Sequence, residues 1–235
     1  MMATQKENKV YQVFQSISGN YDHMNSVISF RLHKRWRKKT MKQMNVSRGA
    51  KALDLCCGTA DWTIQLGKAV GKDGSATGID FSEKMLEVGR EKVHREQLAN
   101  IDLIHGNVNS LPFPDDSFDY VTIGFGLRNV SDYLRVLKEM QRVLKPGGTA
   151  VCLETSWPEN SVVEKFYSFY FQSVMPVIGK VLINRYDEYR WLQESTMAFP
   201  SKETLGVMFM EAGFSQVQMS PFSAGTVCAH IARKK

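Results

Sequence analysis

The sequence predicts a single α/β domain, residues 1–235, built on an open, mostly parallel sheet of seven strands. Three observations lead to this prediction. At 235 residues and 43% hydrophobic, the chain is long and apolar enough to bury one sizeable core. From Ala50 onward, short apolar runs alternate with helical stretches, which is typical of parallel strands joined by crossover helices. The last two apolar runs are too close together for such a crossover, so we expect them to pair antiparallel.

Ahead of the sheet, residues 9–45 carry apolar side chains at helical spacing, which predicts an N-terminal flank of two or three helices. The flank also holds much of the positive charge, because eight Lys and Arg residues lie between Arg31 and Arg48 in a chain of net charge +6. Such a patch is equally consistent with a solvated helix face and with a surface that contacts an anionic membrane.

The strands are predicted where apolar runs are short and bounded by turn-forming residues. They are expected at residues 51–58, 75–80, 101–107, 118–125, 149–155, 215–219 and 227–233. The crossover helices are expected at residues 60–70, 82–97, 132–144 and 201–213. Ser82 is a candidate N-cap, and glycines mark the ends of the last two helices.

An aromatic-rich helical insertion, residues 161–199, breaks the alternation before the last two strands. Between residues 162 and 183 apolar side chains occur all round, which is unusual for a surface helix. The run is interrupted too often for a membrane span, by Gln172, Pro176 and Lys180. We therefore expect the insertion to be covered, either by the N-terminal helices or by a second copy of the chain.

The cysteines, the histidines and the first residues indicate the cellular compartment and whether a metal site is expected. The four cysteines form no C-x-x-C pair, so neither a disulfide framework nor a zinc site is predicted. The first ten residues lack the apolar core of a signal peptide, and we expect a cytoplasmic protein. No metal site is proposed, because the histidines are scattered. His23 and His33 lie where they would line a pocket, although a lone histidine is more often structural.

The turn after the first predicted strand, residues 54–61, bears on the cofactor. It contains one glycine, Gly58, whereas a dinucleotide fingerprint needs G-x-G-x-x-G so that the backbone can approach a pyrophosphate. NAD is therefore not favoured. Small residues here still let the backbone approach an uncharged ribose and a methionine tail, which suits S-adenosylmethionine. The alternative is a tight turn with a purely structural role.

Further candidate residues follow the next strands. Asp80 stands where an acidic side chain accepts hydrogen bonds from both ribose hydroxyls, or it only caps the helix that begins near Ser82. Asn107 and Val108 either flank an adenine or form a simple loop.

Arg128 and Asn129 follow the fourth strand, at the carboxyl edge where open α/β sheets bind ligands. An arginine near the expected sulfonium is unfavourable unless an anion lies between them, and a phenolate would be suitable. The alternative is that Arg128 pairs with a carboxylate in a structural network.

Two segments resemble the two signatures of the menaquinone and ubiquinone biosynthesis C-methyltransferases. They are YDHMNSVISFRLHKRW at residues 21–36 and RVLKPGGTAVCLETS at residues 142–156. The resemblance covers nearly the whole chain and is greatest to the demethylmenaquinone methyltransferases of Gram-positive bacteria. It implies the Rossmann-like fold of class I S-adenosylmethionine methyltransferases.

The resemblance also implies roles for individual residues. Cofactor contacts are implied at Thr59, Asp80, Asn107 and Val108, and catalytic roles at Asp61, Arg128, Asn129 and Tyr21. Some relatives have a serine in the cofactor site where this chain has Gly124, so Gly124 is given no role.

The implied function is transfer of a methyl group to a ring carbon of demethylmenaquinol, a prenylated naphthoquinol. A ring carbon becomes a good nucleophile when a neighbouring hydroxyl loses its proton, and a phenol-like pKa of about 10 leaves little anion at neutral pH. Asp61, Asn129 and Tyr21 are expected to hold a water or to act as the base, while Arg128 stabilises the phenolate.

Other functions stay open at this point. The benzoquinol of ubiquinone synthesis is the second substrate candidate, and a quinone-binding subunit without catalysis also fits the pattern. A nucleic-acid methyltransferase would suit the basic patch, but neither an RNA-binding appendage nor an N-P-P-Y motif is present, so nucleic acid is not expected as a partner. The insertion is expected to form a lid for the prenyl tail, with residues 31–42 on the inner face of the membrane, or to be buried in a homodimer.

Overall fold

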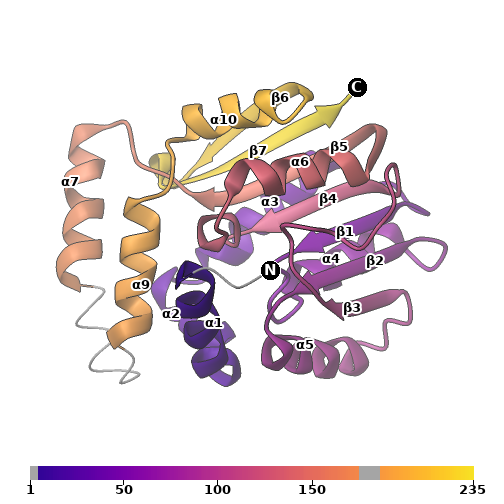
Figure 1. Cartoon of the computed structure of the whole chain (residues 1–235). Coiled ribbons are helices and arrows are strands. Elements are labelled where there is room, and N and C mark those ends of the chain that lie inside the picture. The colour runs from indigo at the N-terminus through magenta and orange to yellow at the C-terminus, as the bar shows by residue number, and fades with distance from the viewer. Residues whose placement is uncertain (1–4, 175–185) are drawn as a thin grey trace.

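The structure, a computed structural model, describes residues 5–174 and 186–235. Its strands form one seven-stranded sheet in the order β3-β2-β1-β4-β5-β7-β6 (Figure 1). They are β1 (Lys51–Leu55), β2 (Ser75–Asp80), β3 (Ile101–His105), β4 (Phe118–Gly124), β5 (Leu144–Thr155), β6 (Phe214–Phe222) and β7 (Val227–Lys234). β7 runs antiparallel to both of its neighbours, while the other pairs are parallel. The predicted sheet and its antiparallel final pair are confirmed.

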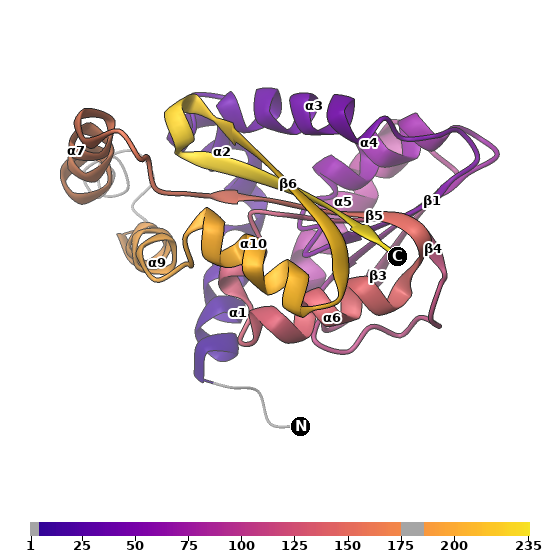
Figure 2. The ribbon, with the colours of Figure 1, turned by 90° about the horizontal axis from the view of Figure 1, so that it is seen from above.

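Helices cover both faces of this sheet (Figure 2). They are α3 (Leu32–Met44), α4 (Asp61–Val70) and α5 (Glu83–Arg95) on one face, and α6 (Tyr133–Val143) and α10 (Lys202–Glu211) on the other. Fully buried side chains such as Leu66 of α4 and Met140 of α6 and Phe209 of α10 pack against the strands. Because both faces are covered, the central strands are buried on both sides and read as continuous apolar runs.

Two local expectations need correction. Ser82 precedes α5 at the N-cap position, but its hydroxyl makes no capping hydrogen bond. β5 begins at Leu144 rather than at residue 149, because Leu144 pairs with Phe118 and the chain bulges before the regular ladder. Neither difference changes the order of the strands.

The N-terminal helices and the insertion lie side by side at one edge of the sheet (Figure 1). They comprise α1 (Gln5–Ile17), the short helix η1 (Ser18–Asn20), α2 (Tyr21–Ile28), α7 (Ser161–Phe169), the π-helical turn η3 (Tyr170–Val174) and α9 (Tyr186–Met197), while α3 continues from α2 over one face of the sheet. Ile17 and Met24 are buried in a cluster with Tyr167, Tyr170 and Leu192 of the insertion. The N-terminal helices therefore provide part of the expected cover. The expectations that rest on residues 175–183 lie outside the described residues.

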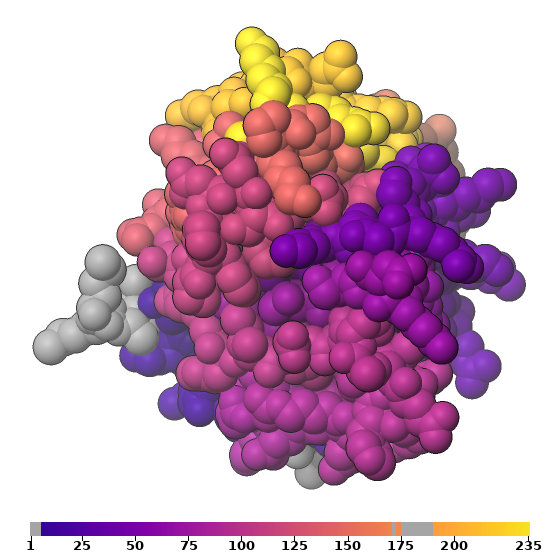
Figure 3. Space-filling model, turned by 90° about the vertical axis from the view of Figure 1, so that its right-hand side faces the viewer, coloured from indigo at the N-terminus to yellow at the C-terminus, as the bar shows by residue number. Residues whose placement is uncertain are grey.

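The carboxyl ends of the parallel strands meet at this same edge. Gly58 to Asp61 follow β1, Asp80 ends β2, Asn107 and Val108 follow β3, and Arg128 and Asn129 follow β4. Figure 3 looks onto the opposite end of the sheet, where the segments that lead into the parallel strands and the carboxyl end of the antiparallel β7 form the surface. The topology thus brings the predicted residues of the sheet to one edge.

Across the described residues, each helix is too short or too polar to cross a bilayer.

Candidate active site

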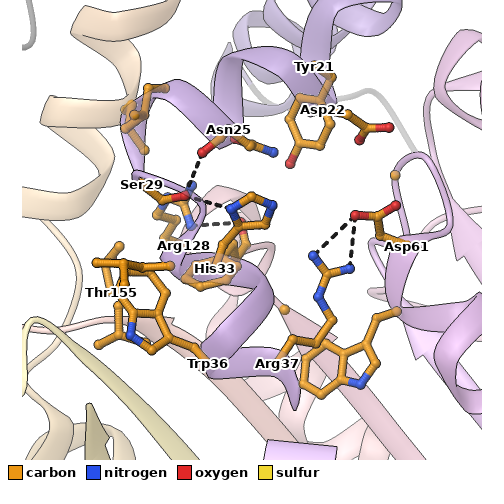
Figure 4. A pocket seen from close by; sticks show the side chains of 18 of the residues that line it. Tyr21, Asp22, Asn25, Ser29, His33, Trp36, Arg37, Asp61, Arg128 and Thr155 are labelled. Atoms are coloured by element: carbon orange, nitrogen blue, oxygen red, sulfur yellow. Dashed lines mark hydrogen bonds and ion pairs between the residues drawn. The ribbon is translucent and has the colours of Figure 1, made fainter. Parts of the chain in front are cut away.

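Two cavities lie at this edge of the sheet. The smaller, about 320 Å³, is enclosed by α2, α3 and the segments after β1 and β4 (Figure 4). The larger, about 730 Å³, is enclosed by α1 and the segments after β2, β3 and β4. Cys56, the first residue after β1, lines both. A ligand that extends past Cys56 would therefore have one end in each cavity.

The turn between β1 and α4 is held in an unusual backbone conformation. Cys56, Gly58 and Ala60 have φ angles of 49°, 55° and 63°, in the left-handed region that favours glycine. Strain of this kind is found mostly at functional sites, where the surrounding structure enforces it. Gly58 and Thr59 line the smaller cavity, as expected of residues whose backbone approaches a ligand.

Asp80 ties this turn to the start of α5. One carboxylate oxygen accepts from the backbone N–H of Gly58 and the other from that of Ser82, each at 2.9 Å. Burial raises the pKa of Asp80 to about 6, although these backbone hydrogen bonds act to lower it. The local capping role is therefore present in the structure. A carboxylate accepts more than one hydrogen bond per oxygen, so the side chain keeps lone pairs in reserve, but Asp80 lies behind the described cavity walls and lines neither cavity.

Asn107 and Val108 line the larger cavity together with Phe81 and Asn109. The side chain of Asn107 accepts from the backbone N–H of Asn109 at 2.9 Å, which fixes the loop after β3. Oδ1 of Asn109 is buried and has no hydrogen-bond partner within the described residues. An unpaired acceptor and an aromatic ring in the lining of one cavity suit the amino group and the ring of an adenine.

Arg128 lines the smaller cavity and is paired with a buried carboxylate. Its Nη1 donates to the carbonyl of Phe125 and to Oε1 of Glu154, both at 2.7 Å. The side chain of Glu154 is only 1% exposed, so water does not screen the pair. The predicted alternative, a structural pair with a carboxylate, is thus present. Nε has no partner in the described part of the chain, so the guanidinium keeps donors for a ligand oxygen.

Asn129 lines the larger cavity rather than the smaller one. Its Oδ1 accepts from the indole N–H of Trp191 at 3.0 Å, and its amide donates to the carbonyl of Phe125 at 3.4 Å. The structure therefore brings Tyr21, Asp61 and Arg128 together but separates Asn129 from them.

Asp61 is held by two cations, Arg37 at 3.3 Å and Lys92. Burial acts to raise the pKa of Asp61, but Arg37 and Lys92 outweigh it and lower that pKa below its usual value. Lys92 also pairs with Asp22 at 2.9 Å. A carboxylate stabilised in this way is a weak base. For the nearby Tyr21, burial raises the pKa, so its hydroxyl stays protonated at neutral pH.

Gly124, at the end of β4, has a packing reason to be glycine. A Cβ at this position would lie 2.6 Å from Cε3 of Trp62, whose indole forms part of the smaller cavity. The indole N–H in turn points to Sδ of Met41 at 3.0 Å. The serine of some relatives therefore cannot be accommodated unless Trp62 moves.

We expect Gly124→Ser to lower the free energy of unfolding by about 1–3 kcal/mol, because it overpacks a buried contact with a rigid ring. Thermal or urea unfolding measures this change. A double variant, Gly124→Ser with Trp62→Phe, provides more room and should recover part of the loss. An unchanged unfolding midpoint in Gly124→Ser would show that Trp62 does not confine this position.

Comparison with known proteins shows to which family the chain with this site belongs. A model of the ubiE/COQ5 methyltransferase family matches residues 2–234. The chain belongs to the ubiE/COQ5 methyltransferase family. It is 58% identical over 233 residues to a demethylmenaquinone methyltransferase of Alkalihalophilus pseudofirmus, covering 99% of each chain. It is 56% identical over 234 residues to that of Geobacillus stearothermophilus, covering 100% of both.

Solved structures support the fold of this ubiE/COQ5 family member. A SAM dependent methyltransferase from Aquifex aeolicus superposes with a TM-score of 0.65 at 21% identity, covering 93% of this chain and 97% of the other. A putative S-adenosyl-L-methionine-dependent methyltransferase from Methanococcus maripaludis superposes with a TM-score of 0.68 at 17% identity, covering 94% of this chain and 93% of the other. The predicted family, methyltransferase activity and class I fold are confirmed.

In this family member, the charged residues that pair with the predicted site residues were not identified from the sequence. Glu154 had a signal, because an acidic residue inside an apolar strand indicates a buried, paired charge. The sequence also contains a signal for Arg37, since this residue lies on the same buried face of α3 as His33 and Met44. The sequence contains no such signal for Lys92, because no neighbouring residue indicates that its side chain reaches Asp61.

Proposed function

We propose that this chain transfers a methyl group from S-adenosylmethionine to a ring carbon of demethylmenaquinol, forming menaquinol. The observation that carries the proposal is the identity of 55–58% to relatives named demethylmenaquinone methyltransferase. The match covers 99% or more of the chain in these cases, so it includes the segments that form both cavities.

The larger cavity and the turn after β1 suit S-adenosylmethionine, which when bound supplies a methyl group on a cationic sulfur. Asp80 accepts hydrogen bonds from the ribose, and Asn107 and Val108 flank the adenine. Gly58 and Thr59 let the backbone approach the methionine portion, which leads past Cys56 into the smaller cavity. The cofactor would thus lie along the carboxyl edge of the sheet.

The smaller cavity suits the quinol ring. Arg128 lines this cavity, and its guanidinium would donate to a quinol oxygen and stabilise the negative charge that develops there. Tyr21 and Asp61 line the same cavity and orient the hydroxyl or a water beside it. Asn129, bonded to Trp191 in the neighbouring cavity, supports the segment that carries Arg128.

Purified protein with labelled S-adenosylmethionine tests this proposal directly. With demethylmenaquinol we expect label in the quinol, at a higher kcat/KM than with the demethylated benzoquinol of ubiquinone synthesis. A preference for the benzoquinol would move the chain to the second candidate substrate. Cofactor binding without transfer to either quinol would contradict an enzymatic role.

A prenylated quinol resides in the bilayer, and an exposed surface beside the smaller cavity suits contact with it. Phe30, between α2 and α3, is 71% exposed, and its ring is tilted against that of Tyr170 with 6.2 Å between the ring centroids. Phe166 and Phe169 of α7 are 71% and 61% exposed. Lys34, Arg35, Lys38 and Lys39 on α3 are also exposed. Arg37, counted in the predicted patch, is instead buried against Asp61.

We therefore infer reversible attachment to the cytoplasmic leaflet through this apolar and basic surface. Neutralising Lys34, Arg35, Lys38 and Lys39 should reduce co-sedimentation with anionic vesicles, because each basic residue near such a surface contributes about 1 kcal/mol. Neutralising four exposed lysines on other elements, Lys72, Lys84, Lys138 and Lys235, is the matched control. Failure of the wild type to bind anionic vesicles at physiological salt, with quinol present, would contradict the inference. A self-association that Phe166→Ser abolishes would assign the surface to a homodimer.

A further inference from the structure

His33 stands on α3 with its imidazole in the wall of the smaller cavity (Figure 4). Its Nδ1 lies 2.6 Å from Oγ of Ser29, and that hydroxyl lies 2.6 Å from the backbone carbonyl of Asn25. A serine hydroxyl has one proton and a carbonyl only accepts, so Ser29 donates to Asn25 and accepts from Nδ1. The network thus assigns the proton of the neutral ring to Nδ1 and leaves a lone pair on Nε2.

The carboxylates around the smaller cavity are already engaged. Asp61 pairs with Arg37 and Lys92, and Asp22 pairs with Lys92. Asp54 is buried at the end of β1 and accepts from the hydroxyls of Thr63 and Thr122, each at 2.7 Å. Each of these carboxylates is thus held by cations or by donated hydrogen bonds, which stabilise its charged form and make it a poorer proton acceptor.

The other titratable side chains of this cavity are protonated. Burial raises the pKa of Tyr21 and of Tyr167 above the ordinary value for tyrosine. Burial likewise raises the pKa of the thiols of Cys56 and Cys57. Nε2 of His33 has no hydrogen-bond partner within the described residues, so it offers the cavity a lone pair that no other group occupies.

We propose that Nε2 of His33 accepts the proton of the quinol hydroxyl next to the ring carbon that is methylated. This inference rests on the proposed function. The O–H bond breaks as an N–H bond forms at Nε2, and the O–H electron pair completes a C=O bond. The electron pair displaced from the ring forms the new bond to the methyl carbon, and the electron pair of the broken C–S bond stays on sulfur. Water then takes the proton from the methylated ring carbon, and the electron pair of that C–H bond restores the aromaticity of the ring. Nε2 returns its proton to the oxygen.

The surroundings keep this imidazole neutral before the reaction. The charged groups that face it are Lys34 and Arg37 on its own helix, Asp22 on α2, Asp61 on α4 and Arg128 after β4. Burial and Arg37 lower the pKa of His33 to about 4, against the opposite influence of Asp61. A weak base suffices, because the hydroxyl becomes more acidic as the neighbouring carbon bonds the methyl group, so that proton transfer accompanies methyl transfer and Arg128 can stabilise the negative charge on the oxygen.

His33→Asn tests the proposal, because asparagine keeps a donor toward Ser29 but offers no basic lone pair. We expect kcat to fall by about a hundredfold or more, with little change in KM for the quinol or in Kd for S-adenosylmethionine. His33→Ala should lose as much and recover part of its kcat when imidazole is added. His23→Asn, an exposed histidine on α2, is the matched control and should keep wild-type kcat.

Ser29→Ala provides a second test, since it removes the acceptor that holds Nδ1 and should lower kcat less than His33→Asn does. His33→Asn with wild-type kcat would overturn the proposal while the proposed function stands. Loss of cofactor binding in His33→Asn together with no imidazole rescue of His33→Ala would also overturn it, because a structural role would then account for the loss. Wild-type protein that methylates neither quinol would overturn the proposed function and this proposal with it.

Discussion

Arg128→Ala is expected to lower turnover of demethylmenaquinol by about a hundredfold or more while cofactor affinity stays nearly intact. The guanidinium lines the smaller cavity, and its Nε donates to no described residue, so the developing phenolate would lose its main electrostatic partner. Steady-state methylation gives kcat and KM, and calorimetric titration gives the Kd for S-adenosylmethionine. Arg128→Lys should rescue poorly, because one ammonium cannot bind Glu154 and a quinol oxygen with the same planar geometry.

The structure adds a second expected effect of Arg128→Ala, on stability. Glu154 would be left buried without its partner, and breaking a buried ion pair in this way costs about 3–5 kcal/mol. Urea unfolding measures the loss. The double variant Arg128→Ala with Glu154→Gln removes the stranded charge, so it should regain stability without regaining turnover. Recovery of turnover in the double variant, or an equal loss of cofactor binding in Arg128→Ala, would contradict the catalytic role.

Asp80→Ala is expected to weaken S-adenosylmethionine binding, because two charge-assisted hydrogen bonds to the ribose would be lost at about 1.5–3 kcal/mol each. Calorimetric titration at pH 7.5 measures the change. Since Asp80 also accepts from the backbone of Gly58 and Ser82, the variant should loosen the turn after β1 as well. An unchanged Kd in a folded variant would leave Asp80 with its capping role alone.

The pH dependence of binding separates these roles of Asp80. The carboxylate, not the carboxylic acid, accepts from both ribose hydroxyls, and burial raises its pKa to about 6 in the free protein. Binding should therefore weaken as pH falls through 6, because the proton competes with the cofactor. Asp80→Asn has no such proton to gain, so its weaker binding should show a smaller change between pH 7.5 and pH 5.5. Parallel curves for wild type and Asp80→Asn would show that another group titrates.

The parallel sheet and its antiparallel final pair were predictable from the sequence because their signals are local. Short apolar runs between helical stretches predict parallel strands, and the short connection before β7 predicts the antiparallel final pair. The carboxyl edge follows from that topology, so the segments that carry Asp80 and Arg128 were expected at one edge. The family signatures at residues 21–36 and 142–156 depend on residue order alone, and the family comparison confirms them.

The partners of those residues were decided by the tertiary structure. Arg128 and Glu154 are 26 positions apart, and Lys92 reaches Asp61 across 31 positions, so neither pair has a local pattern. Whether Asn129 faces the cavity of Arg128 or the neighbouring one depends on the short helix η2 (Leu127–Asn129), which turns adjacent side chains to different sides.

Periodicity and motif thus determined the class of fold, the family and the edge that carries the site. Charge pairing, which depends on how helices approach in space, decided which side chains are free there. Asp61 is occupied by Arg37 and Lys92, whereas His33, for which the sequence left a pocket role and a structural role open, lines the smaller cavity and bonds Ser29 through Nδ1. The physical reason is that a side chain's basicity depends on its burial and on its neighbours in space, which the order of residues along the chain does not specify.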